Sequence, residues 1–271
     1  MNHLLASVLL SGACISAFAQ PAKAPASAAL LEYFNKSIVN WDRGPTGPAG
    51  TSAFHEHDFL QVRSQLRELG TAAQPLAPRI ADQMLTSQKN KYVLGYMLMD
   101  LTPSTPDTGL PEAMEQAASA DAAAQLVGLA RLGKSMSQGA VAPLTVGLEA
   151  QELPRRLMST IAMGSAGKYA PEVAARALAP HLKDPDRSVR AAAAASLRML
   201  GEPSKVAAAD LIDYLRSREN IYAATAALKE LPVDAIRPAK GELEAIVADP
   251  KFGQFIKQPA VDLLMRIEKA Q

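Results

Sequence analysis

Residues 182–201 read LKDPDRSVRAAAAASLRMLG and contain the pattern that decides the fold. The last five of these residues, LRMLG, match the stretch LRELG at 66–70. Between and beyond these two stretches the same register returns at intervals of 32, 31, 34, 34 and 31 residues. A fixed period of this size is the sequence signature of stacked repeats rather than of a domain with one centre.

The repeated register consists of two apolar positions, three residues apart, and a residue that ends a helix. The first position holds Leu66, Leu98, Leu129, Met163, Leu197 and Leu228. The second position holds Leu69, Leu101, Leu132, Ala166, Leu200 and Leu231. The next residue is Gly70, Thr102, Gly133, Gly167, Gly201 or Pro232. Glycine ends helices because it takes positive φ without steric cost, and a proline a few residues later suits the first turn of another helix. Each unit therefore predicts a helix, a turn and a second helix.

One helical hairpin cannot bury both of its faces, so the units are expected to stack on one another. The sequence predicts an all-α fold, an α-α superhelix of about six hairpins over residues 58–250. Helices at 28–41 and within 251–271 would cap its two ends, and the alanine run at 191–195 would let neighbouring helices approach closely. The alternative is a helical bundle in which the similarity between segments is fortuitous.

The stretch 182–201 resembles a HEAT-type repeat, with its Asp-Pro-Asp turn, its Val-Arg pair and its alanine and leucine core positions. The resemblance implies that Asp186 and Arg190 link neighbouring units through charge-assisted hydrogen bonds. It also implies structural roles for Val189, Leu197, Leu200 and Gly201. HEAT repeats form scaffolds and binding surfaces, so the resemblance implies no catalytic residue and no cofactor.

The amino-terminal segment predicts export. Residues 1–19 have an apolar core, lack charged side chains and end in Ala-Phe-Ala, which is typical of a signal peptide cleaved after Ala19. Residues 20–27 have the Pro, Ala and Ser bias of a disordered leader. Cys14, the single cysteine, offers an alternative in which it is lipidated and becomes the mature amino terminus. Either process places the mature protein in the periplasm or outside the cell.

Residues 28–57 combine the predicted capping helix with a Gly/Pro-rich loop that begins at residue 43. The loop ends in His55-Glu56-His57, and Asp58 follows directly. Imidazoles and carboxylates are metal-ligand types, so a metal-binding module or a metal-dependent enzyme is an open alternative. A zinc site needs three or four converging ligands, whereas histidines and an acid in this place can also be solvated or cap a helix.

Composition weakens several other classes of function. The chain of 271 residues has 28 Lys and Arg against 27 Asp and Glu, a net charge of +1, whereas nucleic-acid binding normally needs a basic excess on one face. The run from Leu4 to Ile15 is shorter than the roughly 20 apolar residues of a membrane span. A P-loop pattern lies at 128–135, but Leu129 and Leu132 place it on a helix, where no free amide groups could hold a phosphate.

The sequence therefore predicts a non-catalytic protein-binding or scaffold protein of the bacterial envelope, which uses a solenoid groove to bind a protein or peptide. Charged residues of the second helices are candidates for the wall of this groove. They are Arg79, Asp82, Glu112, Glu115, Glu172, Arg176, Asp210 and Asp213. A solvated surface with no ligand would carry the same residues.

Overall fold

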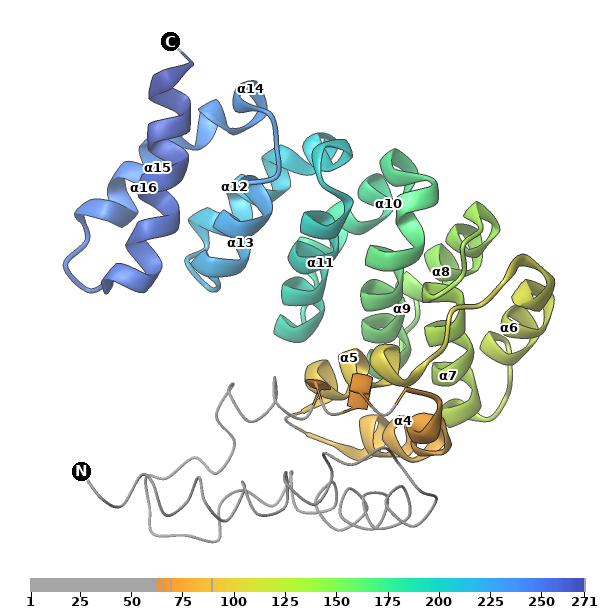
Figure 1. Cartoon of the computed structure of the whole chain (residues 1–271). Helices are drawn as coiled ribbons and strands as arrows, with labels where there is room; N and C mark the ends of the chain where they lie inside the picture. The colour runs from red at the N-terminus through yellow and green to blue at the C-terminus, as the bar shows by residue number, and fades with distance from the viewer. Residues whose placement is uncertain (1–62, 65, 69, 89, 271) are drawn as a thin grey trace, which may run out of the picture. The chain divides into compact units, whose positions relative to one another are not determined.

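The computed structural model describes residues 63–270 apart from 65, 69 and 89, and these residues form an all-α fold (Figure 1). Within them there is no strand, and one isolated bridge pairs Thr105 with Ser135. The predicted signal peptide, leader, amino-terminal capping helix and loop, with Cys14 and the segment 55–58, lie outside the described residues. The chain divides into two compact units, residues 1–76 and 77–271.

The described part of the first unit is helical. The described residues between 63 and 68, all but residue 65, are helical, and the 3-10 helix η1 (Gly70–Leu76) follows them. Leu66 is fully buried, as the register predicts. Gly70 has φ of +53°, which ends the helical turns before it.

The second unit is a succession of short helices joined by turns and 3-10 segments. The α-helices are α4 (Ala77–Thr86), α5 (Lys91–Leu101), α6 (Leu110–Ala117), α7 (Ala122–Gly133), α8 (Val141–Leu148), α9 (Leu153–Ala166), α10 (Pro171–Leu178), α11 (Arg187–Leu200), α12 (Ala208–Arg216), α13 (Ile221–Leu228), α14 (Val233–Ile236), α15 (Lys240–Ala248) and α16 (Gln254–Lys269). The 3-10 helices are η2 (Asp107–Gly109), η3 (Gln138–Ala140), η4 (Gly167–Tyr169), η5 (Ala179–Lys183), η6 (Glu202–Ala207) and η7 (Arg237–Ala239).

From α6 onward the helices alternate between two layers. Helices α7, α9, α11, α13 and α16 follow one another in the first layer, each packed against the next. In the second layer α8 packs against α10, α10 against η6, and α12 against η5 and α14. Figure 1 shows α6, α8 and α10 beside α7, α9 and α11. The chain thus passes back and forth between the layers.

Helix α5 departs from this alternation. It packs against α4, and it also contacts three helices of the first layer, α7, α9 and α11. Gly95 allows the close approach, because a Cβ atom there would lie 2.6 Å from Cδ1 of Ile161 on α9. Six of its eleven residues are buried. Burial on several sides explains why KYVLGYMLMDL is apolar around most of the helix.

The described residues of the leucine register lie in the core. Leu197 is fully buried and Leu200 is 7% exposed, and Val189 in the same helix is fully buried. Every other described member of the register is buried as well, namely Leu66, Leu98, Leu101, Leu129, Leu132, Met163, Ala166, Leu228 and Leu231. The prediction that these positions face the core is confirmed.

The glycines after the register have two different roles. Gly70 and Gly201 take positive φ, and Gly201 caps α11 as predicted. Gly133 and Gly167 do not, so the predicted left-handed helix stop is wrong for them. They are close-contact sites, since a Cβ atom would lie 2.8 Å from Cβ of Ala162 at position 133 and 2.5 Å from Cβ of Ala174 at position 167.

Two glycine substitutions are expected to have opposite effects on stability. A Cβ atom at Gly128 would lie 2.3 Å from the backbone nitrogen of Ala117, so Gly128→Ala should force α6 and α7 apart and lower the free energy of unfolding by about 1 to 3 kcal/mol. Gly241 in α15 has open space, so Gly241→Ala should raise it by up to about 1 kcal/mol. Urea titrations of both variants test this, and equal effects would contradict the close crossing at Gly128.

Candidate functional site

Two arginines hold equivalent positions in successive helices of the first layer. Arg156 in α9 donates from Nε to Oδ2 of Asp184 at 2.7 Å, and Arg190 in α11 donates from Nε to Oε2 of Glu219 at 2.8 Å. Each guanidinium also donates to backbone carbonyls in the loop before its own helix. Lys91 in α5 occupies the matching position and also donates to carbonyls of the preceding segment. The two arginines therefore tie each loop to the next one.

The structure assigns different roles to the two acids of the Asp-Pro-Asp turn. Asp186 caps α11 by accepting from the backbone nitrogen of Ser188 at 2.7 Å. Asp184, whose side chain is 4% exposed, receives Arg156 from the previous hairpin. Arg190 thus bonds Glu219 of the following loop, whereas Asp186 caps its own helix. An N-cap side chain faces the free amide groups of its own helix, which leaves the acid two residues earlier to reach the neighbouring unit.

His181 lies beside this junction and is almost completely buried. Its Nδ1 is 3.8 Å from Oδ2 of Asp184, and its Nε2 is 3.7 Å from Oε1 of Glu149 and has no hydrogen-bond partner. Burial lowers the pKa of His181 below its usual value, while the two carboxylates oppose that shift and Arg156 reinforces it. The neutral imidazole is therefore favoured in the folded protein.

The lowered pKa of His181 predicts a loss of stability on acidification. In the pH interval between the folded pKa and the unfolded value near 6.5, the unfolded chain binds more protons, so the free energy of unfolding falls as the pH falls. His181→Gln should remove this part of the pH dependence. Urea titrations of both proteins from about pH 7.5 to pH 5 would measure it, and parallel curves would contradict the prediction.

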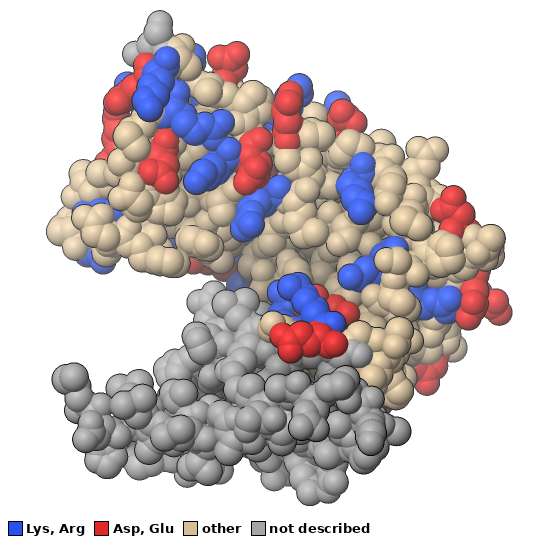
Figure 2. Space-filling model, viewed as in Figure 1, with Lys and Arg blue, Asp and Glu red and all other residues tan. Residues whose placement is uncertain are grey.

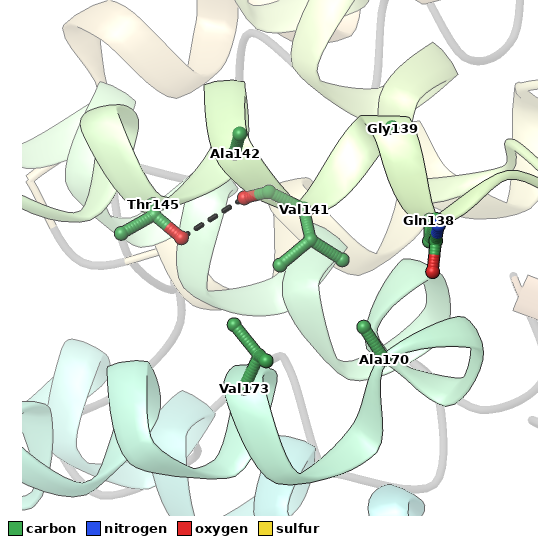
Figure 3. A pocket seen from close by; sticks show the side chains of 7 residues that line it. All are labelled: Gln138, Gly139, Val141, Ala142, Thr145, Ala170 and Val173. Atoms are coloured by element: carbon green, nitrogen blue, oxygen red, sulfur yellow. Dashed lines mark hydrogen bonds between the residues drawn. The ribbon is translucent and has the colours of Figure 1, made fainter.

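An open groove of about 550 Å³ lies between α8 and α10 (Figure 3). It is lined by Gln138, Gly139, Val141, Ala142, Thr145, Ala170 and Val173. The side chains of Val141 and Val173 approach each other across it. Two of the lining side chains are polar, those of Thr145 and Gln138. The hydroxyl of Thr145 donates to the carbonyl of Val141, within the same helix, at 2.9 Å. The groove is an apolar surface.

The segments that border the groove carry exposed apolar side chains. Val146 in α8 is 65% exposed, Val173 in α10 is 58% exposed, and Tyr169 precedes α10. Isolated surface residues of this kind are ordinary, but a contiguous apolar groove is typical of an interaction site. The sequence-based prediction did not include this groove. The sequence of α8, VAPLTVGL, does carry a signal for it, since a surface helix without any charged residue is unusual.

The eight predicted groove residues lie on four different helices and do not form one site. They are exposed, except for half-buried Asp210, and α4 carries Arg79 and Asp82, α6 carries Glu112 and Glu115, α10 carries Glu172 and Arg176, and α12 carries Asp210 and Asp213. None of the eight lines the groove between α8 and α10. Glu172 and Arg176 come nearest in sequence, since they flank Val173 on α10.

Several of these charges are engaged in ion pairs between neighbouring elements. Arg131 bonds Glu112 at 3.1 Å, which lowers the pKa of that carboxyl. Lys183 bonds Asp210 at 2.7 Å and lies 3.6 Å from Asp213. Figure 2 shows acidic and basic side chains interspersed over the visible face. Pairs of this exposure contribute little to stability individually.

The P-loop pattern lies on a helix, as predicted. Gly128, Leu129 and Leu132 belong to α7 and are buried, and the backbone nitrogen of Lys134 bonds the carbonyl of Ala130. Backbone amides that already pair within a helix cannot surround a phosphate. The pattern is therefore part of the helical core.

Residues 55–58 lie outside the described part of the chain, so the metal-binding alternative stays a prediction. Among the described residues, no three His, Cys, Asp or Glu side chains are placed to hold one metal ion. The described helices also include none that is long and apolar enough to cross a membrane.

Comparison with known proteins finds structural similarity at low sequence identity. No protein-family model matches the chain. No curated protein matches it either. The chain is similar to a crystal structure described as an engineered protein of the Northeast Structural Genomics Consortium, with 14% sequence identity and a TM-score of 0.48. That similarity covers 77% of this chain and 97% of the engineered one.

Proposed function

We propose that residues 77–271 form a HEAT-like α-solenoid that acts as a non-catalytic scaffold of the bacterial envelope and binds a protein or peptide in the groove between α8 and α10. The observation that carries the proposal is the open apolar groove of about 550 Å³ between two neighbouring helices of one layer. A solenoid offers such grooves wherever successive units stand side by side.

The repeated contacts support the solenoid. First-layer helices pack in chain order from α7 to α16, and the register positions in α7, α9, α11 and α13 are buried. Arg156 and Arg190, seven residues before the register positions Met163 and Leu197, make equivalent bonds to the next loop. Contacts that recur with the sequence period are expected when every unit rests on its neighbour.

The lining of the groove supports binding rather than catalysis. Its side chains are aliphatic or small, apart from Gln138 and Thr145, and no acid, histidine or lysine lines it. Covering exposed apolar area contributes about 25 cal/mol per Å², so aliphatic side chains of a partner would gain affinity by covering Val173, which is 58% exposed. Flanking charges such as Glu172 and Arg176 would then select the partner.

Site-specific photo-crosslinking tests this proposal. A photoreactive benzoylphenylalanine replaces Val173 in the groove or, as the control, Met199, which is 54% exposed on first-layer helix α11. We expect a discrete adduct with one envelope protein from position 173, absent from position 199 and abolished by Ala142→Asp together with Gln138→Asp, two substitutions at exposed lining residues. Equal labelling from both positions, or labelling that survives the aspartate substitutions, would exclude the groove.

Export can be tested on the same preparation. Mass spectrometry of the mature amino terminus should find Gln20 if the signal peptide is cleaved after Ala19. Acylated Cys14 would instead indicate a lipid anchor, which changes the attachment of the proposed scaffold but leaves its groove unaltered.

A further inference from the structure

A stacked pair of aromatic rings lies exposed where α13 and α16 begin. Tyr222 and Phe255 have ring centroids 5.1 Å apart and ring planes inclined by 12°. Tyr222 is 46% exposed and Phe255 is 72% exposed. Rings of this size are normally buried on folding, so an exposed stacked pair is a candidate interaction surface.

The segments that precede α13 and α16, the helices that carry these rings, are held together by Arg218. Its guanidinium lies 5.7 Å from the ring centroid of Phe252, 4.0 Å from Oε2 of Glu242 and 3.7 Å from Oδ2 of Asp249. Arg218 also has φ of +56°, a conformation that side-chain-bearing residues rarely adopt and that often marks functional sites. The segment before α13 is thus fixed to the segment before α16, which presets the distance between Tyr222 and Phe255.

In the segments around the rings, the acidic side chains are paired with arginines, whereas two lysines have no acidic partner among the described residues. The neighbouring acids Glu219, Glu242 and Asp249 are each engaged by an arginine. Lys251 and Lys257, which flank Phe255 in the chain, make no ion pair with a described acidic side chain. Lys251 is exposed and Lys257 is half-buried. The uncompensated charge of this segment is therefore positive.

We infer that Tyr222, Phe255 and Lys251 form a second docking surface, separate from the groove between α8 and α10, for an acidic, extended peptide that places a proline ring against the aromatic pair. Lys257, two residues after Phe255 in α16, lies on another face of that helix and adds to the positive charge of the region. Proline-rich segments dock on exposed aromatic rings because their extended helix is already formed before binding. The two lysines attract carboxylates and so favour acidic segments over basic ones. The fixed loops lower the ordering that binding would otherwise require.

Fluorescence polarisation with synthetic peptides tests this inference. The probe is a labelled dodecapeptide of alternating glutamate and proline, compared with glutamate-alanine and lysine-proline dodecapeptides. We expect the wild-type chain to bind the glutamate-proline peptide about tenfold more tightly than either control peptide. Phe255→Ser and the double variant Lys251→Glu/Lys257→Glu should each weaken that binding about tenfold, and the affinity should fall as salt is added.

Control variants keep the result specific to this surface. Met199→Ser removes an equally accessible apolar side chain, and Lys229→Glu reverses an exposed lysine at the other end of α13, so both should bind like the wild type. Thermal unfolding by circular dichroism confirms that each variant is folded. Equal affinity for all three peptides, or unchanged binding by Phe255→Ser, would overturn the inference. Binding to anionic phospholipid vesicles that requires Phe255, without binding of the peptide, would also overturn it and assign the surface to a membrane.

Discussion

Replacing Leu197 with alanine is expected to lower the free energy of unfolding by about 2 to 5 kcal/mol. Leu197 is fully buried in α11, the helix that packs between α9 and α13 in the first layer. Removing its isobutyl group leaves a cavity at a contact that joins successive units, because packed helices collapse only partly around such a gap. Chemical denaturation followed by circular dichroism measures the change.

Met199→Ala provides the matched control for Leu197→Ala. Met199 belongs to the same helix but is 54% exposed, so its truncation should leave the free energy of unfolding close to the wild-type value. If both alanine variants had similar effects, helix propensity rather than core packing would explain the loss, and the register would not define the core.

Replacing Arg156 with methionine should lower the free energy of unfolding by about 3 kcal/mol or more, because the carboxylate of Asp184 would remain buried without its cation. The two side chains are 15% and 4% exposed, and the Nε to Oδ2 distance is 2.7 Å. The same substitution also removes a donor to the carbonyl of Ala150, which adds to the loss. Urea titration at neutral pH measures the effect.

A double variant separates the ion pair from simple loss of packing. Arg156→Met/Asp184→Asn removes both charges, so it should be more stable than Arg156→Met alone. Lys205→Met is the control for an exposed pair, since Lys205 and Glu202 are 3.4 Å apart and mostly exposed, and its stability should stay near the wild-type value. A double variant less stable than Arg156→Met would mean that the buried charge is not the source of the loss.

The period of the leucines predicted the helical content and the core, because a helix that buries one face needs apolar residues three or four positions apart. The identity of the linking residues was less predictable. Arg190 follows from its place in the repeat, but the choice between Asp184 and Asp186 depends on which carboxylate lies inside the first helical turn. Glu219, which receives Arg190, belongs to a loop whose geometry the repeat does not determine.

Contacts between elements far apart in the chain could not be predicted in the same way. The composition of α5 indicates burial on several sides, yet it does not tell which helices cover it. Glycine in the sequence likewise does not distinguish a positive φ, as at Gly201, from a close approach, as at Gly133. The groove between α8 and α10 depends on the separation of two helices, which a local pattern does not encode.

Helix α5 has a mechanical consequence for residues 77–271. Because it touches α7, α9 and α11, any bending at the two joints between those helices must also disrupt contacts with α5. Bending beyond α11 leaves these contacts intact. We therefore expect the stretch from α7 to α11 to be stiffer than the segments that follow it, so that bending of residues 77–271 occurs mainly beyond α11.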